Sequence, residues 1–483
     1  MIINSETLSI VWIALPLFVG FSIYLLPQFD RALAIAISLA SFGYGLWHIF
    51  DPAPLTIHLL DNFGVSLLID DLSGFFILTN AIVTAAVILY CWHSGKSSFF
   101  YTQAVILHGS VNAVFVSADL ISVYVALEVI SIAAFLLIAY SRTSRSIWVG
   151  LRYLFVSNTA MLFYLMGSVL VYQANHSFAF EGLANAPIEA IAFIFLGLLT
   201  KGGIFVSGLW LPLTHSESET PISALLSGVV VKTGVFPLVR FALMVPEIDP
   251  IVRLFGVGTA LLGVSYAVFA KDSKRILAFH TVSQLGFILA APVVGGFYAL
   301  THGLVKSALF LIVGNLPSRN IKELKEKPMP TSLWVALAIA SFSISGFPLL
   351  AGFGAKVLTA KNLVPWQVIG MNIAALGTAI SFAKFIFLPH TSETSSSDMV
   401  KKGFWPAVVI LLLGLVLANG FYYDAYSVKN IVKPLVTIAV GWLAYLLLFQ
   451  KLSIKLPRVA EQFNHLIGAM SLMLAFLFWM VLT

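Results

Sequence analysis

Apolar stretches long enough to cross a lipid bilayer follow one another along nearly all of this chain of 483 residues. A helix needs about 20 apolar residues to cross the hydrocarbon core, and a bilayer admits only structures that pair their own backbone groups. We therefore predict a bundle of about 14–16 membrane-spanning helices. The candidate spans are 8–28, 31–49, 72–92, 101–118, 119–140, 149–173, 188–211, 222–245, 250–270, 275–295, 297–316, 331–362, 366–388, 404–423, 430–449 and 462–482.

Composition excludes a soluble protein, since 59% of the residues are hydrophobic and 10% are charged, with a mean hydropathy of +0.97. The loops between the spans are too short to hold a soluble domain. We predict one all-α, polytopic membrane domain over 1–483. Its parts are N-terminal helices (1–100), a first repeat (101–245), a second repeat (250–388) and C-terminal helices (404–483).

Basic loops predict the orientation, because short loops rich in Lys and Arg stay on the cytoplasmic side. The loops 141–152, 271–275, 317–327 and 450–458 are basic and share one side of the predicted topology. The acidic loop around Asp61 falls on the other side, so both termini are expected outside. The net charge of +6 belongs to the basic loops and gives no reason to expect nucleic acid. The first span lacks a small-residue cleavage site and is expected to remain as a helix.

Cysteine and histidine usage argues against several enzyme classes. The single cysteine, Cys91, cannot build an iron–sulfur cluster, a zinc knuckle or a disulfide within this chain. The histidines show no pair spaced to bind a metal on one helix turn, and no dinucleotide or phosphate-binding glycine motif is present. We therefore expect no metal, no cofactor and no catalytic residue here, and we expect that the chain is not itself an enzyme.

Charged residues inside otherwise apolar spans are the main functional signal. Such a residue costs roughly 3 kcal/mol at bilayer depth and usually faces a protein interior or an ion path. Glu128 lies within "ISVYVALEVISIAAF" and Lys201 within "IFLGLLTKGGIFVSG". An ion pair between them that forms and opens would change the affinity of the lysine for a proton, as a proton pump or antiporter requires.

Two pairs of lysines inside the spans indicate an internal repeat. Lys201 and Lys232 lie in consecutive spans, 31 residues apart, and Lys356 and Lys384 lie in another consecutive pair, 28 residues apart. Glycines loosen the backbone beside the first lysine of each pair. Duplicated, broken helices around a polar centre are typical of transporters built from inverted repeats. We predict two inverted repeats, each with one broken helix.

Two further histidines belong to this pattern. His302 stands four residues before Lys306, so both project from one helix face between the two lysine pairs, and we expect them to link the repeats. His215, beside two glutamates, is a candidate proton entrance on the cytoplasmic side, with a solvated loop as the alternative. Trp210 is expected to be an anchor at the membrane interface.

Four segments have a spacing specific to one family. They are "TKGGIFVSGLWLPLTHSESETPISALLSGVVVKTGVFPLVR" (200–240), "DSKRILAFHTVSQLG" (272–286), "HGLVKSALFLIVG" (302–314) and "SGFPLLAGFGAK" (345–356). They resemble the antiporter-like subunit family, which holds the D subunit of Mrp-type multisubunit sodium/proton antiporters and the large membrane-arm subunits of respiratory complex I. "HTVSQLG" and "AGFGAK" are more similar to the Mrp D subunit, whereas complex I subunits more often have His where Gln284 stands. The tail beyond Lys356 departs from the Mrp D pattern, because it holds more helices.

The resemblance implies a proton-translocating subunit of an Mrp-type monovalent cation (Na⁺)/proton antiporter, in an energy-converting membrane such as the bacterial cytoplasmic membrane. It implies other membrane subunits, protons and Na⁺ as partners. The expected proton path along the middle of the membrane comprises Glu128, Lys201, Lys232, His302, Lys306 and Lys356, and the repeat adds Lys384.

Alternatives stay open at this point. The same axis would serve a proton-pumping membrane subunit of a complex I type NAD(P)H or ferredoxin:quinone oxidoreductase. A scaffold that only supports assembly is weakened because all the key ionisable positions are occupied. Structural roles also compete at single residues: Glu128 could pin helix packing, His302 could be a core histidine, and Lys384 could extend to the interface from its helix end.

Overall fold

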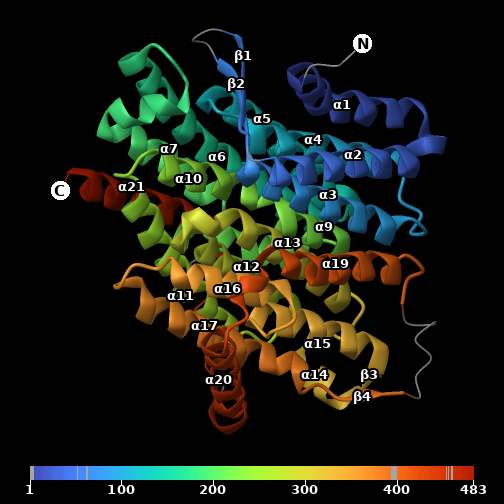
Figure 1. The fold of residues 1–483 in the computed structure, drawn as a ribbon. Helices are drawn as coiled ribbons and strands as arrows, with labels where there is room; N and C mark the ends of the chain where they lie inside the picture. The colour runs from blue at the N-terminus through green and yellow to red at the C-terminus, as the bar shows by residue number, and fades with distance from the viewer. Residues whose placement is uncertain are drawn as a thin grey trace.

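The computed structural model describes residues 5–51, 53–60, 64–392, 400–452, 454, 456–457 and 461–482, and about 80% of the chain is helical (Figure 1). Fourteen described helices are long and apolar enough to cross a membrane. The helix α12 (Ser273–Ala290) and the broken pair α15 (Thr331–Ser345) and α16 (Ala351–Lys361) complete the sixteen predicted crossings. The prediction of a polytopic, all-α membrane protein is confirmed.

The remaining elements follow the predicted spans closely. The first half contains α1 (Ser5–Leu25), η1 (Pro27–Phe29), α2 (Asp30–Phe50), β1 (Leu55–Leu60), β2 (Gly64–Ile69), α3 (Asp71–Cys91), α4 (Ser98–Val116), α5 (Leu120–Ile138), η2 (Ala139–Ser141), α6 (Ser144–Asn175), η3 (Phe180–Asn185), α7 (Ile188–Lys201), η4 (Val206–Trp210), α8 (Leu211–Glu217), α9 (Thr220–Leu225), η5 (Leu226–Val230) and α10 (Lys232–Met244). The second half contains α11 (Asp249–Phe269), η6 (Pro292–Val294), α13 (Gly295–Val313), α14 (Ile321–Glu326), β3 (Met329–Pro330), α17 (Gln367–Ile386), β4 (His390–Thr391), α19 (Phe404–Ala418), η7 (Asn419–Ala425), α20 (Val428–Ala444), η8 (Tyr445–Phe449) and α21 (Phe463–Leu482).

Two groups of five crossings form the repeats, one from α4 to α10 and one from α11 to α17. In each group the fourth crossing is broken, as α7/α8 and as α15/α16. Because five is odd, the second group enters the membrane from the side opposite to the first. The repeats are therefore inverted.

Glycines and left-handed residues explain both breaks. After α7, Gly203 has φ 72° and Phe205 has φ 51°, and after α15, Gly346 has φ 87° and Leu349 has φ 79°. Left-handed backbone cannot continue a right-handed helix, and it is strained for residues other than glycine. The chain leaves each helix at these points.

The centre of the bundle is α13, which is wholly buried, and the segment from α9 to α10 is buried over most of its length. The helix α13 packs against α9 and η5 of the first repeat, against α12, α15 and α16 of its own repeat, and against α3 and α19. It therefore contacts both repeats and the C-terminal part. By contrast, α1 and α20 expose most of their surface, as expected for helices that face lipid or other subunits.

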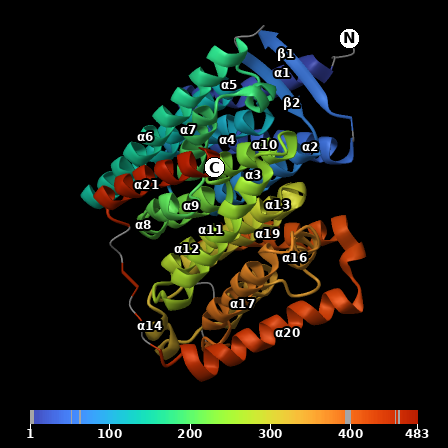
Figure 2. The ribbon, with the colours of Figure 1, turned by 90° about the vertical axis from the view of Figure 1, so that its left-hand side faces the viewer.

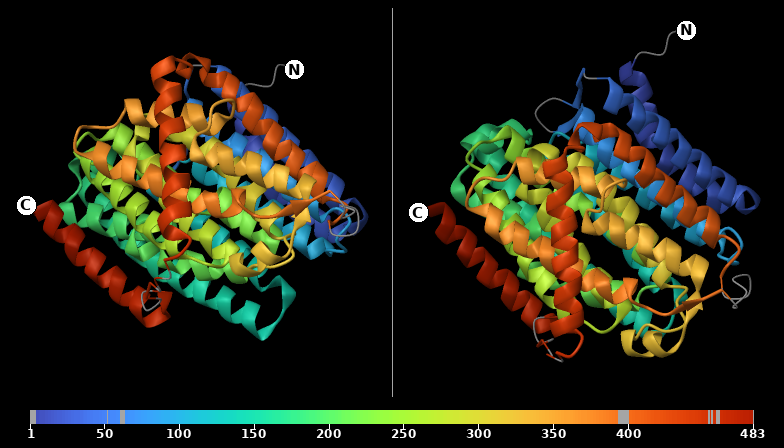
Figure 3. Two further views of the ribbon diagram at one scale, coloured as in Figure 1. Left: turned by 90° about the horizontal axis from the view of Figure 1, so that it is seen from below. Right: turned by 60° about the horizontal axis from the view of Figure 1, so that its bottom comes forward.

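The C-terminal helices cover two edges of the bundle. Figure 2 shows α21 alongside α6 and α7 and α20 alongside α17. Both helices lie on the outside of the molecule, and α20 crosses the neighbouring helices obliquely (Figure 3). The helices α20 and α21, which the sequence predicts after the second repeat, therefore pack against the outside of the two repeats.

Two small sheets depart from the all-α prediction in the described residues, the antiparallel hairpin β1–β2 and the parallel pair of β3 and β4. β1 pairs with β2 from Leu55 opposite Ile69 to Leu60 opposite Gly64. The buried Asp119 holds β2 near the hairpin turn, because its carboxylate accepts a hydrogen bond from Ser66 N at 2.8 Å. Hydropathy analysis assigns this segment to a loop because each strand is too short to cross a bilayer.

Candidate functional site

Lys201 is the last residue of α7, and its ammonium lies in a pocket made by α5 and α6. Its Nζ donates to Ser131 Oγ at 2.5 Å, to Ser157 Oγ at 2.5 Å and to the carbonyl of Leu127 at 3.2 Å. The residue is 3% exposed. We call these three acceptors the serine cradle. The break after α7 leaves the lysine at a helix C-terminus, where the helix dipole favours a cation.

Glu128 adjoins the serine cradle but does not contact Lys201. It follows Leu127 on α5, it is only partly buried, and within the described residues it makes no ion pair and no hydrogen bond. It lies close enough to Lys201 for an electrostatic interaction. Val125 and Ile132 on the same helix are exposed. The ion pair expected between Glu128 and Lys201 is therefore not formed in the structure, and Glu128 lies on the same helix as the exposed Val125 and Ile132.

Lys232 starts α10 directly after a π-helical turn. The wider turn at η5 leaves two carbonyls without their usual α-helical partner, and Lys232 Nζ donates to them, to Gly228 O at 2.6 Å and to Ser227 O at 3.2 Å. Single π-turns inside helices are frequent at functional sites. The side chain is fully buried.

A bonded chain of polar groups joins Lys232 to Lys306. Ser227, whose carbonyl accepts from Lys232, also bonds through its hydroxyl to Thr281 Oγ1 at 2.7 Å. Thr281 donates to the carbonyl of Leu277 at 3.0 Å, and Lys306 Nζ donates to the same carbonyl at 2.5 Å. The two lysines come from different repeats, so this chain crosses the middle of the molecule.

His302 and Lys356 meet at a small cavity. The cavity has a volume of about 10 Å³ and is lined by Gln284, Tyr298 and Ser343 among others. Both ring nitrogens of His302, Ser343 Oγ and Lys356 Nζ are buried without a hydrogen-bond partner. A space of this size suits about one water molecule. His302 lies on α13, and its linking of the two lysine pairs stays a prediction.

His280 is a buried residue of this centre that the sequence analysis did not single out. It lies on α12, is fully buried, has no hydrogen-bond partner for either ring nitrogen, and is close enough to interact electrostatically with His302. Its presence within "HTVSQLG" was the available signal. Ser157 was also missed, because a serine in an apolar helix carries no distinctive pattern.

Lys384 has a different environment from the other lysines. Its Nζ donates to the carbonyls of Ala267, Val268 and Ala270 at 3.1, 2.6 and 2.8 Å. These carbonyls end α11, so the lysine caps that helix. It does not line the cavity shared by His302 and Lys356.

His215 is buried, so the solvated-loop alternative is wrong. It lies on α8, is 0% exposed, and its ring stacks on Phe310 with 5.3 Å between the centroids. Lys306 and Lys274 are close enough to interact with it electrostatically. His215 therefore lies between the central lysine and the cytoplasmic end of α12.

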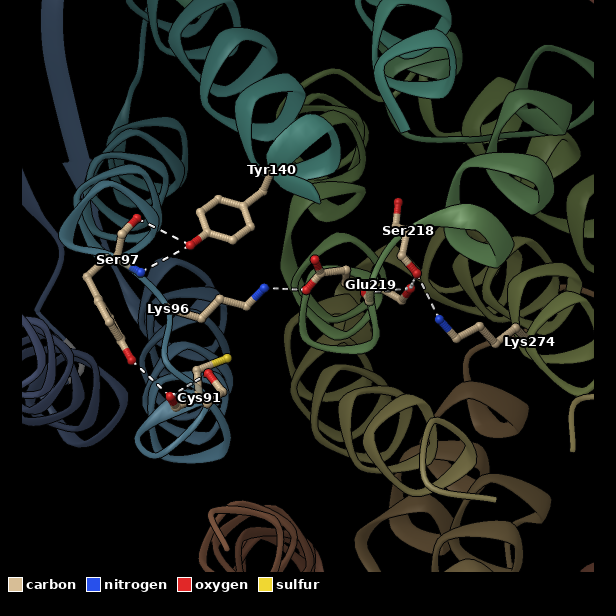
Figure 4. A network of polar contacts seen from close by, with 10 residues as sticks. Cys91, Lys96, Ser97, Tyr140, Ser218, Glu219 and Lys274 are labelled. Carbon is tan, nitrogen blue, oxygen red and sulfur yellow. Dashed lines mark hydrogen bonds and ion pairs between the residues drawn. The ribbon is translucent and has the colours of Figure 1, made fainter. Parts of the chain in front are cut away.

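Two lysines hold the junction between α8 and α9 on the cytoplasmic side (Figure 4). Lys96 Nζ donates to the Glu219 carboxylate at 2.5 Å, and Lys274 Nζ donates to the carbonyl of Ser218 at 2.8 Å. Ser223 Oγ donates to the carbonyl of His215 at 2.8 Å. Polar contacts therefore run from this junction to the backbone of His215.

On the opposite side, Asp70 joins α3 to α10. Arg240 Nη2 donates to Asp70 Oδ1 at 2.8 Å, and Nη1 bonds to Oδ2. Asp70 also caps α3 by accepting from Ser73 N at 3.0 Å. Burial raises the pKa of Asp70, but the hydrogen bonds and charge of Arg240, together with Ser73, hold it below its usual value.

Trp210 is not an interfacial anchor. It is 2% exposed, and its Nε1 donates to the carbonyl of Thr200 at 2.8 Å. The break after α7 folds the chain back, so the indole closes the end of that helix instead of reaching the headgroups. Among the described residues, no group of three His, Cys, Asp or Glu side chains could hold a metal ion.

The family described as NADH:quinone oxidoreductase/Mrp antiporter, TM, matches residues 117–381. This segment is more than half of the chain. Among similar proteins, the NADH-quinone oxidoreductase subunit N of Desulforudis audaxviator is 28% identical over 430 residues, covering 78% of this chain and 85% of that protein. The D subunit of the Na(+)/H(+) antiporter of Alkalihalophilus pseudofirmus is 27% identical over 422 residues, with the same two coverages.

Two solved structures share the fold. A chain of the Mrp complex from Dietzia sp. superposes with a TM-score of 0.78 at 22% identity, covering 96% of this chain and 59% of that chain. A chain of the archaeal membrane-bound sulfane sulfur reductase superposes with a TM-score of 0.77 at 20% identity, covering 91% of this chain and all of that chain.

Proposed function

The chain belongs to the NADH:quinone oxidoreductase/Mrp antiporter transmembrane family, and on this premise we propose that it is the proton-translocating subunit of a multisubunit Mrp-type Na⁺/proton antiporter. Its role would be to move protons along a buried axis while cations move in the opposite direction. The observation that carries the proposal is the series of buried cationic groups from α7 to α16, two of which share one bonded polar chain.

The path would run from Lys201 through Lys232 and Lys306 to Lys356. His302 would serve the last step, because it and Lys356 face one cavity of about water size. A water in that cavity would carry the proton between His302 and Lys356. The chain between Lys232 and Lys306 would hold the two lysines in place, because its carbonyls only accept hydrogen bonds and pass no proton. His215 would connect the cytoplasmic junction of α8 and α9 to Lys306. Lys384 would support this path by fixing the end of α11.

Glu128 would gate the first lysine. Its carboxylate lies beside the serine cradle on a surface that is exposed in the single chain. An approach of the carboxylate to Lys201 would stabilise the charged lysine, and its withdrawal would release that stabilisation. A neighbouring subunit that covers α5 would place Glu128 in a lower dielectric and strengthen this coupling.

The first test is transport in everted membrane vesicles that contain the whole complex. A pH gradient should collapse when Na⁺ is added without any electron donor. Lys201→Ala and Glu128→Ala should abolish this collapse while the complex still assembles, because each removes one member of the gate. Lys429→Ala is the matched control, since this lysine lies on the exposed face of α20 and should leave transport unchanged. Wild-type transport in both gate variants would refute the proton-path assignment.

The second candidate is a proton-pumping membrane subunit of a complex I type NAD(P)H or ferredoxin:quinone oxidoreductase. The 28% identity to a subunit N from such an enzyme favours it. In that assembly the chain would move protons while other subunits carry the redox chemistry. The same vesicles separate the two functions: a proton gradient built on addition of an electron donor, without any response to Na⁺, would select the oxidoreductase.

Both functions require a multisubunit complex in an energy-converting membrane. The exposed apolar faces of α1 and α20 leave surface for lipid and for other subunits. Protons are the ion moved in either assembly, and Na⁺ is the counter-ion only in the antiporter.

A further inference from the structure

The ammonium of Lys201 is fully satisfied without Glu128. A lysine ammonium has three N–H donors and no acceptor. Ser131 Oγ, Ser157 Oγ and Leu127 O supply three acceptors, so each donor has one partner. Lys201, Ser131 and Ser157 are 3%, 0% and 3% exposed. An ammonium with fewer partners at this depth would incur a large desolvation cost.

The hydroxyls of the serine cradle are held by bonds that do not involve the lysine. Ser131 Oγ donates its proton to the carbonyl of Leu127 at 2.8 Å, one turn earlier on α5. The oxygens of Ser131 and Ser157 lie 2.9 Å apart, and with the Ser131 proton committed, Ser157 donates in this bond. Lone pairs of both oxygens are therefore left for Lys201. Such an acceptor site favours the charged lysine over the neutral one.

We infer that Ser131 and Ser157 are positioning residues that form a second docking place for charged Lys201, in competition with Glu128. This inference rests on the proposed function. The proton stays on Lys201 in both places, and only its acceptors change. Lys201 can therefore leave Glu128 without first losing its proton, and onward transfer toward Lys232 starts from the serine cradle.

The other titratable groups near Lys201 do not take the place of the serine cradle. On α5 and α6, the titratable side chains that face the lysine are Glu128 and Tyr153, whose ring lies 5.7 Å from Nζ. Lys232 on α10 bonds to its own π-turn. On α21, which also packs against α7, the titratable side chain in the described residues is His465, near the start of that helix.

The test is the pH dependence of Na⁺-driven gradient collapse in vesicles carrying Ser131→Ala or Ser157→Ala in the whole complex. Removing one acceptor from a buried ammonium should make the lysine lose its proton at lower pH. We expect the midpoint of the transport profile to move by about one pH unit toward acid. Ser168→Ala is the matched control, because Ser168 is also buried on α6 but donates to Tyr164 O, away from Lys201.

Threonine variants at 131 and 157 keep the hydroxyl and should keep the wild-type midpoint. If the alanine variants assemble but are inactive at every pH, the threonine variants decide the outcome. Transport by the threonine variants supports the inference, and loss of transport in them as well overturns it. Unchanged midpoints in both alanine variants, or an equal shift in Ser168→Ala, also overturn it. The proposed function fails separately, by wild-type transport in Lys201→Ala.

Discussion

Lys356 and Lys201 occupy matching places in the two repeats, yet their surroundings differ. Each follows the pattern of a lysine beside a helix break. Lys201 Nζ has three acceptors, whereas Lys356 Nζ is buried without any hydrogen-bond partner and lies over the ring of Phe287 at 5.5 Å. A buried charge without hydrogen-bond partners is costly, so Lys356 lowers the stability of the folded chain.

This contrast predicts opposite effects on stability and transport. Lys356→Met should raise the free energy of unfolding by about 1–2 kcal/mol, because it removes an unpartnered polar group from an apolar site, and it should abolish transport. Thermal unfolding in detergent and vesicle transport measure the two effects. Lys201→Met is the control and should not stabilise, since it removes three hydrogen bonds, those to Ser131 Oγ, Ser157 Oγ and Leu127 O. A destabilised Lys356→Met variant would contradict the account.

Asp70 gives a prediction for pH. Its pKa lies below the usual 3.8 in the folded chain, so its bond to Arg240 contributes fully above that value and is lost as the pH falls through the lower, folded pKa. Asp70→Asn should cost about 1–2 kcal/mol of unfolding free energy at neutral pH, discounted for partial exposure. The cost should fade in acid. A cost that is the same at neutral and strongly acidic pH would contradict this role.

Single residues show what a sequence can predict about a site. Lys201, Lys232, His302, Lys306 and Lys356 stand out because charge inside apolar spans is rare. The serine cradle does not stand out, because it forms only when α5, α6 and α7 pack together. The burial of Trp210 and His215 depends in the same way on how the chain returns after the break in α7.

At the scale of elements, the broken helices hold the lysines in place. Gly203 has φ 72°, and a Cβ there would lie 2.7 Å from Leu211 Cδ1. Hydropathy and glycine content predicted where the spans and breaks lie. They could not predict the π-turn before Lys232 or the β1–β2 hairpin, because both arise from local hydrogen bonding that apolar periodicity does not record.

Gly203→Ala should therefore destabilise the protein by about 1–2 kcal/mol, the cost of a left-handed residue with a side chain. The unfolding midpoint in detergent measures this. Gly43→Ala provides the comparison, because Gly43 is exposed on α2 and a Cβ there would meet nothing within 4 Å. That change should be neutral or slightly stabilising. Equal effects of the two substitutions would show that the break is not held by backbone geometry.

At the scale of the whole molecule, Glu461 ties the C-terminal part to both repeats. Its carboxylate pairs with Arg275 of α12, and its carbonyl accepts from Arg152 of α6. The helix α21 that follows packs against α7 and η4. The sequence predicted these late helices but not their place, because spans of similar hydropathy carry no information on which neighbour they contact.

Glu461→Gln should cost about 3 kcal/mol of unfolding free energy, because it leaves Arg275 buried without a carboxylate. The matched change is Asp249→Asn, which should cost less than about 1 kcal/mol, because the Asp249 side chain is 31% exposed and Arg253 keeps the carbonyls of Ala290 and Asn362 as acceptors. Thermal unfolding in detergent distinguishes the two. An unaffected Glu461→Gln variant would mean that α21 docks without this residue.

The central claim is that protons cross along the buried lysines, and Lys306 shares the carbonyl of Leu277 with the polar chain that reaches Lys232 in the first repeat. The most direct measurement is Na⁺-driven collapse of a pH gradient in vesicles carrying Lys306→Ala in a fully assembled complex. The account predicts that the collapse is lost. Collapse at the wild-type rate would contradict it.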